Sequence, residues 1–136
     1  MRTRRGANAI EFALTFPVFT FLLFGLIEYG WYFYERYQLA EVTRAGCRAG
    51  ALLHPDDADP SHRADVTARI EIRKYCQHAG LSCDKGDGVR VDYVGASPDE
   101  ALRCLTTQPH VRLTGLSIPI PRDMAAVAEL HLELQR

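Results

Sequence analysis

The sequence predicts an α+β protein, with a long N-terminal transmembrane helix that continues into a small outer domain containing a second helix and a short antiparallel sheet. Two observations carry this prediction. An apolar segment without charge covers residues 12–27, and the later part of the chain combines helical spacing of apolar residues with short alternating stretches. With 136 residues, the chain has room for one domain at most beside the membrane segment.

The apolar segment is long enough to cross a bilayer. Its aromatic character resumes after Glu28 and continues to Tyr34, which gives about 23 residues and roughly 34 Å of helix, against about 30 Å of hydrocarbon. A cleavable secretory signal peptide is one alternative, but such a peptide has a shorter apolar part and ends at a small-residue site that is missing here. A buried core helix is another, but the remaining chain is too small to wrap one. We therefore expect a membrane helix.

The residues on either side of this segment predict its direction. Arg2, Arg4 and Arg5 precede it and should stay in the cytoplasm by the positive-inside rule. The C-terminal domain is therefore expected outside the cytoplasm. Aromatic side chains typical of the far membrane interface follow the segment: Tyr29, Trp31, Tyr32, Tyr34 and Tyr37.

The first fifty residues also carry a set of more specific features. These are a short basic leader, Gly6, Glu11 five residues later, Pro17, the triplet Glu28, Tyr29 and Gly30, and the run RAGCRAGA. On these features the stretch RRGANAIEFALTFPVFTFLLFGLIEYGWYFYERYQLAEVTRAGCRAGA resembles the N-terminal region of TadE-like proteins, the minor pseudopilins of tight-adherence (Flp-type) pilus systems. The resemblance implies a pilin-like outline, which is a long N-terminal helix with a small head.

The resemblance further implies a processing site and an assembly site. A membrane prepilin peptidase would cut after Gly6 and leave Ala7 as the new N-terminus, with Glu11 as its fifth residue. A carboxylate inside a membrane segment is costly and usually has a partner, which the new α-amino group of a neighbouring subunit would provide. Glu11 would then set the register between subunits. The alternative is that Glu11 lies at the level of the lipid headgroups, since it follows Arg5 closely.

The helix should continue beyond the membrane. No helix breaker occurs between Tyr34 and Pro55, so we expect the helix to end near His54. Apolar and charged residues recur on two different faces, and the apolar face should hold the outer domain. The apolar positions are Leu39, Val42, Gly46, Ala49 and Leu53, and the charged ones are Glu41, Arg44 and Arg48. The chain thus divides into a leader (1–6), a transmembrane helix (7–34), its continuation (35–54) and an outer domain (55–136).

The outer domain should begin with a helix. Asp59 and Pro60 suit the start of a helix and Gly80 suits its end, which predicts a helix from about residue 61 to 79. Residues 89–93 then alternate apolar and charged side chains, as strands do.

Further strands are less clearly marked. A weaker candidate lies around Val111 and Leu113, and another is indicated by the alternation of Leu130, Leu132 and Leu134. Residues 96–109 fit either a helical turn or a short strand.

Four cysteines in a small exported domain suggest two disulfides. Of the three pairings, we favour Cys76 with Cys83, close across a helix end, and Cys47 with Cys104, which would tie the long helix to the sheet. A zinc site that combines cysteines with histidines is the alternative, but neither C-x2-C nor H-x3-H spacing occurs.

The sequence shows no pattern of a catalytic or ligand-binding site. It has no G-x-S-x-G, no HExxH and no glycine-rich phosphate loop, and its acidic stretches DDADPSH and DKGDGV do not match a calcium loop. The net charge is −1, and no basic stripe is interleaved with aromatic residues. We therefore expect no enzyme, no cofactor, no small-molecule substrate and no nucleic-acid partner.

The function predicted from the resemblance is that of a minor pseudopilin in the bacterial cytoplasmic membrane, acting by subunit packing. Its expected partners are the membrane, the prepilin peptidase, other pilins and pseudopilins, and the pilus assembly platform. The alternative is a monomeric single-pass membrane protein whose outer domain binds or senses a ligand. A major pilin fits less well, because Flp-type major pilins are much shorter.

Overall fold

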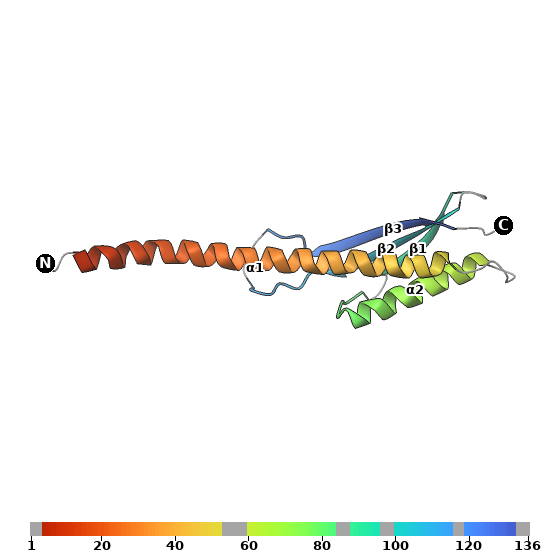
Figure 1. The fold of residues 1–136 in the computed structure, drawn as a ribbon, viewed down its shortest axis with the longest axis horizontal. Coiled ribbons are helices and arrows are strands. Elements are labelled where there is room, and N and C mark those ends of the chain that lie inside the picture. The colour runs from red at the N-terminus through yellow and green to blue at the C-terminus, as the bar shows by residue number, and fades with distance from the viewer. Residues whose placement is uncertain (1–3, 53–59, 84–87, 96–99, 116–118, 133–136) are drawn as a thin grey trace. The chain divides into compact units, whose positions relative to one another are not determined.

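The computed structural model describes residues 4–52, 60–83, 88–95, 100–115 and 119–132. These residues form two helices followed by three strands (Figure 1). The α+β prediction with a long N-terminal helix is therefore confirmed. The elements are α1 (Arg4–Ala51), α2 (Pro60–His78), β1 (Val89–Val94), β2 (Ala101–Pro109) and β3 (Asp123–His131). The chain divides into two compact units, residues 1–33 with 112–120, and residues 34–111 with 121–136.

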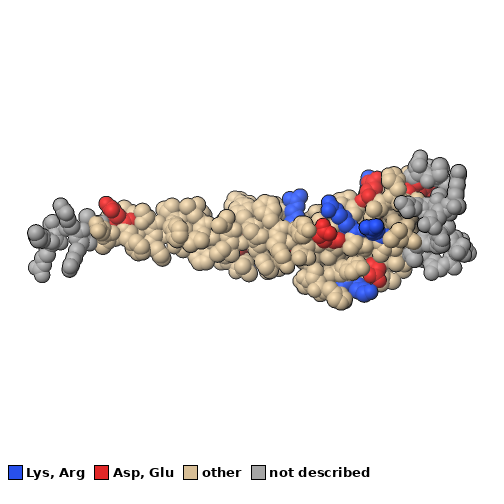
Figure 2. Space-filling model, viewed as in Figure 1, with Lys and Arg blue, Asp and Glu red and all other residues tan. Residues whose placement is uncertain are grey.

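Helix α1 is 48 residues long and continues through Pro17. Among the described residues it is the one helix long and apolar enough to cross a membrane, and the side chains of its most apolar window are not buried. Figure 2 shows a long stretch of this helix without charged side chains on the face in view, while Lys, Arg, Asp and Glu gather over the unit that contains α2 and the sheet. The helix ends at Ala51; the expected end near His54 lies outside the described residues.

Within the second unit, α2 lies beside the C-terminal part of α1 (Figure 1). Two glycines make this close approach possible. A Cβ on Gly46 would meet the Ile72 side chain and lie 2.8 Å from its backbone nitrogen. A Cβ on Gly50 would lie 2.6 Å from the Ala64 carbonyl oxygen and 2.7 Å from the Ala68 Cβ. The two helices therefore pack nearly backbone to backbone.

Helix α2 agrees closely with the predicted 61–79, and its end has a clear cause. Gly80 has a φ of 69°, which favours glycine. The Gly80 N–H donates to the Gln77 carbonyl at 3.2 Å, and the Leu81 N–H donates to the Cys76 carbonyl at 2.9 Å. These two bonds form a Schellman cap, which satisfies carbonyls that the helix end leaves open.

The three strands form one antiparallel sheet in the order β1-β2-β3. Buried and exposed residues alternate along much of each strand. Since successive side chains of a strand point to opposite faces of the sheet, one face of this sheet is buried and the other is exposed. The register aligns Val91, Cys104 and Ala128 across the three strands on this face. The buried residues of the face are Val89, Val91, Leu102, Cys104, Thr106, Gln108, Met124, Ala126 and Ala128.

One of the strand predictions was wrong. Val111 and Leu113 belong to no strand; both are exposed, and Gly115 follows with a φ of 71°. The predicted leucine alternation overlaps β3, which begins at Asp123 and ends at His131, only at Leu130; Leu132 follows the strand, and Leu134 lies outside the described residues. The buried face of β3 consists of small residues and one methionine, and the exposed Val127 interrupts the apolar-polar contrast. The central strand β2 lies in the stretch that the sequence left open.

Two disulfides join these elements, and they are the pairs favoured above. Cys47 of α1 is bonded to Cys104 of β2, with 5.9 Å between their Cα atoms. Cys76 of α2 is bonded to Cys83 after the helix end, with 6.0 Å between their Cα atoms. All four cysteines are buried. Since each thiol is used in a disulfide, the cysteines are not available as zinc ligands.

Candidate assembly site

The residues predicted to direct processing and assembly lie at the start of α1. Gly6 and Ala7 are helical, and Glu11 follows Ala7 by four residues, which is about one turn. The Glu11 side chain is exposed, and none of the described residues forms an ion pair with it. Its backbone carbonyl accepts a hydrogen bond from the Thr15 hydroxyl at 2.9 Å. The carboxylate is thus accessible to a group from another molecule.

The surface of α1 after Glu11 is almost entirely apolar and exposed. In a soluble protein, an apolar area of this size would mark an interaction surface or a membrane contact. The large apolar side chains exposed before Glu28 are Ile10, Phe12, Leu14, Phe16, Val18, Phe19, Phe21, Leu22, Leu23, Phe24, Leu26 and Ile27. The helix therefore presents a largely exposed hydrophobic surface.

Glu28 departs from this pattern because it is fully buried. Its Oε1 accepts a hydrogen bond from the Leu113 N–H at 3.0 Å. Its Oε2 accepts two, from the Thr114 N–H at 2.8 Å and from the Thr114 hydroxyl at 2.7 Å. These three hydrogen bonds join the segment that follows β2 to α1.

A second carboxylate of α1 holds the same segment closer to β2. The Glu35 Oε2 lies 2.6 Å from the His110 Nδ1, and the two side chains are 13% and 1% exposed, respectively. This contact belongs to the second unit, whereas that of Glu28 belongs to the first.

Sequence reasoning noted Glu28 only as part of a motif and did not single out Glu35. A signal was nevertheless present. Glu28, Tyr32, Glu35, Leu39 and Val42 follow one another in steps of four and three residues, which places them on one stripe of the helix. The apolar seam predicted from Leu39 onward therefore starts earlier, and its first part contains two acidic residues. Leu39 and Val42 are buried, as the seam predicts.

Comparison with known proteins adds a family to this geometry. Residues 6–48 match the family model described as TadE-like protein. These residues of the N-terminal region are similar to TadE-like proteins. No curated protein and no solved structure matches the chain.

The TadE-like region contains all three carboxylates described above, Glu11, Glu28 and Glu35, and ends just after Cys47. It therefore covers most of α1, including Cys47, which forms the disulfide with Cys104. Helix α2 and the sheet lie outside it. The match thus concerns α1 alone. The head, by which we mean α2 and the three-stranded sheet, has to be interpreted from its own contacts.

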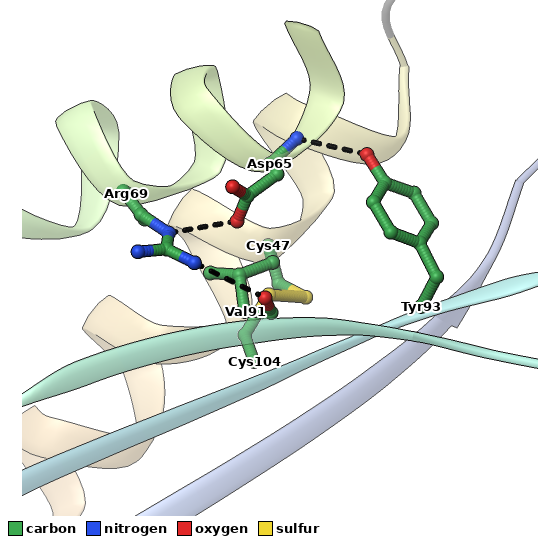
Figure 3. Close-up of polar contacts among 6 residues, drawn as sticks. All are labelled: Cys47, Asp65, Arg69, Val91, Tyr93 and Cys104. Carbon is green, nitrogen blue, oxygen red and sulfur yellow. Dashed lines mark hydrogen bonds and ion pairs between the residues drawn. A yellow bond between two sulfur atoms is a disulfide. The ribbon is translucent and has the colours of Figure 1, made fainter. Parts of the chain in front are cut away.

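In the head that follows the TadE-like region, polar side chains fasten α2 to the edge strand β1 (Figure 3). The Arg69 Nε donates to the Asp65 Oδ1 at 2.7 Å, and its second nitrogen donates to the Val91 carbonyl at 3.4 Å. The Tyr93 hydroxyl accepts from the Asp65 N–H at 3.1 Å. The Val91 carbonyl of the edge strand β1 is therefore occupied by Arg69, and this opposes the pairing of β1 with a strand of another chain.

Within its described part, the head holds no group of three or more His, Cys, Asp and Glu side chains that could bind a metal ion. On the exposed face of the sheet, Arg103 and Glu129 face each other across β2 and β3 at 3.0 Å.

Proposed function

We propose that this protein is a minor pseudopilin that takes part in assembly of a tight-adherence (Flp, type IVb) pilus or a related secretion system. It would act by packing against other subunits and not by catalysis. The observation that carries the proposal is the TadE-like match over residues 6–48, which coincides with the exposed apolar surface of α1. A subunit that is stored in a membrane and then packed into a filament needs such a surface in both settings.

The proposal includes a topology. Residues 1–6 form a cytoplasmic basic leader, residues 7–34 cross the cytoplasmic membrane, and the head lies outside. The arginines before the apolar segment support this direction. The two disulfides support it as well, since disulfides form and persist in compartments outside the cytoplasm.

The proposal also assigns roles to the start of α1. Prepilin peptidase cuts between Gly6 and Ala7, and the Glu11 carboxylate then pairs with the new α-amino group of a neighbouring subunit. The exposure of Glu11 supports this role, because a carboxylate inside an apolar segment gains most from a charged partner. Other pilins or pseudopilins and the assembly platform are the implied partners.

The leader is tested by mass spectrometry of the membrane-extracted protein from cells with and without the prepilin peptidase. We expect a chain beginning at Ala7 in the first cells and an intact leader in the second. An intact leader in both, without copurifying pilus components, would refute the proposal and favour a monomeric membrane protein with a binding or sensing head.

The role of Glu11 is tested separately by Glu11→Ala, with Glu41→Ala as the matched control. Glu41 is also an exposed carboxylate of α1, but it pairs with Arg44 at 3.6 Å within the charged stripe. We expect Glu11→Ala to reduce the amount of assembled pili on the cell surface and Glu41→Ala to leave it unchanged. Equal assembly in both variants would remove the register role from Glu11.

A further inference from the structure

The connection between β2 and β3 has the composition of a membrane-inserting loop. Residues 113–121, LTGLSIPIP, carry no charge, and one arginine stands on each side, Arg112 and Arg122. The loop is closed at its base, because the His110 N–H donates to the Arg122 carbonyl at 2.6 Å. An uncharged run between two arginines suits a lipid interface, where the chain enters hydrocarbon and the guanidinium groups stay with the phosphates.

Two apolar side chains at the start of this connection are exposed, whereas Ile120 near its end is buried. Val111 is 66% exposed and Leu113 is 59% exposed. Two large exposed aliphatic side chains so close together are unfavourable in water, because each keeps apolar surface hydrated. Burial in lipid would remove this cost.

The loop follows the membrane helix toward its N-terminal end. Pro119 lines an apolar groove together with residues of α1 on both sides of Glu28, and the first of them, Phe21, precedes Glu28 by seven residues, or roughly 10 Å along the helix. The loop thus reaches the level of the uncharged segment. The α1 residues in the groove are Phe21, Leu22, Gly25, Leu26 and Tyr29.

A loop at this depth must satisfy its backbone polar groups, because no water is available in hydrocarbon. Glu28 supplies acceptors for two of its N–H groups, those of Leu113 and Thr114. Pro119 and Pro121 have no N–H to satisfy. The loop is therefore suited to an apolar setting by the same carboxylate that fixes it to α1.

We propose that the described residues of the uncharged run, 113–115 and 119–121, insert into the lipid leaflet on the side of the head, with Glu28 as the residue that positions them on the membrane helix. This inference rests on the membrane span of the proposed function. It gives the head a second contact with the bilayer, and it explains why a buried carboxylate directly follows the uncharged segment of α1.

Insertion is tested with the full chain in phosphatidylcholine vesicles whose acyl chains are brominated, since bromine quenches tryptophan emission at short range. Trp31→Phe removes the single native tryptophan. Three reporters are then compared in this background: Leu113→Trp in the loop, Phe19→Trp in the helix, and Val127→Trp on the outward face of β3, where Val127 is 60% exposed. Acrylamide added to the water measures the opposite accessibility.

We expect the Phe19→Trp and Leu113→Trp reporters to lose most of their emission in brominated lipid and to resist acrylamide, with the reverse for Val127→Trp. If only the Phe19→Trp reporter responds to bromine, the loop is not in lipid and this inference fails while the membrane span stands. If the Phe19→Trp reporter does not respond, the span itself is refuted, and the proposed function with it.

The positioning role of Glu28 is tested by adding Glu28→Gln to the Leu113→Trp reporter. A glutamine places an NH2 group where one of the two carboxylate oxygens accepts hydrogen bonds, so the loop should detach and its reporter should become open to acrylamide. Glu11→Gln is the matched control, because Glu11 lies on the same helix and is exposed. Unchanged quenching in Glu28→Gln, with the disulfides intact by non-reducing mass mapping, would overturn this role.

Discussion

Replacing Gly50 by alanine probes the close approach of α1 and α2, and two opposing effects decide its sign. In a free helix, alanine is more favourable than glycine by about 1 kcal/mol. Here the new Cβ would lie 2.6 Å from the Ala64 carbonyl oxygen, 2.7 Å from the Ala68 Cβ and 3.1 Å from the Leu102 Cδ2. The first two atoms cannot rotate away, so α2 has to move.

Overpacking of this kind costs about 1 to 3 kcal/mol, and the rigid neighbours of Gly50 place it in the upper part of that range. After the gain in helix propensity is subtracted, we expect Gly50→Ala to lower the free energy of unfolding by about 1 to 2 kcal/mol. With an m-value near 1 kcal/mol/M for a small domain, the urea midpoint should fall by about 1 to 2 M.

The assay is pulse proteolysis of the head in urea, on the full chain in detergent with both disulfides intact. Gly30→Ala is the matched control, since Gly30 lies in the same helix and a Cβ there would meet nothing within 4 Å. We expect no loss of stability in this control. A Gly50→Ala midpoint equal to or above that of the unchanged protein would refute the reasoning, because it would mean that α2 can retreat without cost.

The same assay checks three further predictions. Replacing both Cys47 and Cys104 by serine should lower the free energy of unfolding by about 4 kcal/mol, and replacing both Cys76 and Cys83 should lower it by about 2 kcal/mol. The bridged residues are 57 and 7 positions apart, and a disulfide that closes a longer loop removes more entropy from the unfolded chain. The opposite ranking would argue against this entropic account. Glu35→Ala should cost about 1 to 3 kcal/mol, since the acceptor beside the buried His110 ring is lost, and a change below a few tenths would show that the contact adds nothing. Gly80→Ala should cost about 1 kcal/mol through its φ of 69°, and unchanged stability would mean that the cap relaxes.

The parts of the fold that were predictable depend on local physics. The uncharged apolar run is sufficient by itself to predict α1. The end of α2 is set by Gly80, because glycine adopts a positive φ more easily than other residues do. The disulfide pairs followed from their places at a helix end and on two elements that had to pack. In each case the deciding contacts are close in sequence or chemically unmistakable.

The parts that were missed depend on contacts between distant segments. Strand β2 is central, with neighbours on both sides, so its residues do not need a strong alternation of their own. The role of Glu28 arises because Leu113 and Thr114, 85 and 86 positions later, present their N–H groups to it. Only the four-three spacing that joins Glu28 to Leu39 was visible beforehand, and it indicates a buried position without revealing its partner.

The bond between Cys47 and Cys104 has a mechanical consequence. It connects the middle strand of the sheet directly to the long helix, so a pull on either one reaches the other through covalent atoms. Under load, the remaining contacts of the head can open and close again while the strand stays tethered at that point. Complete separation of β2 from α1 at this point would then require reduction of the disulfide, and tension alone would not suffice.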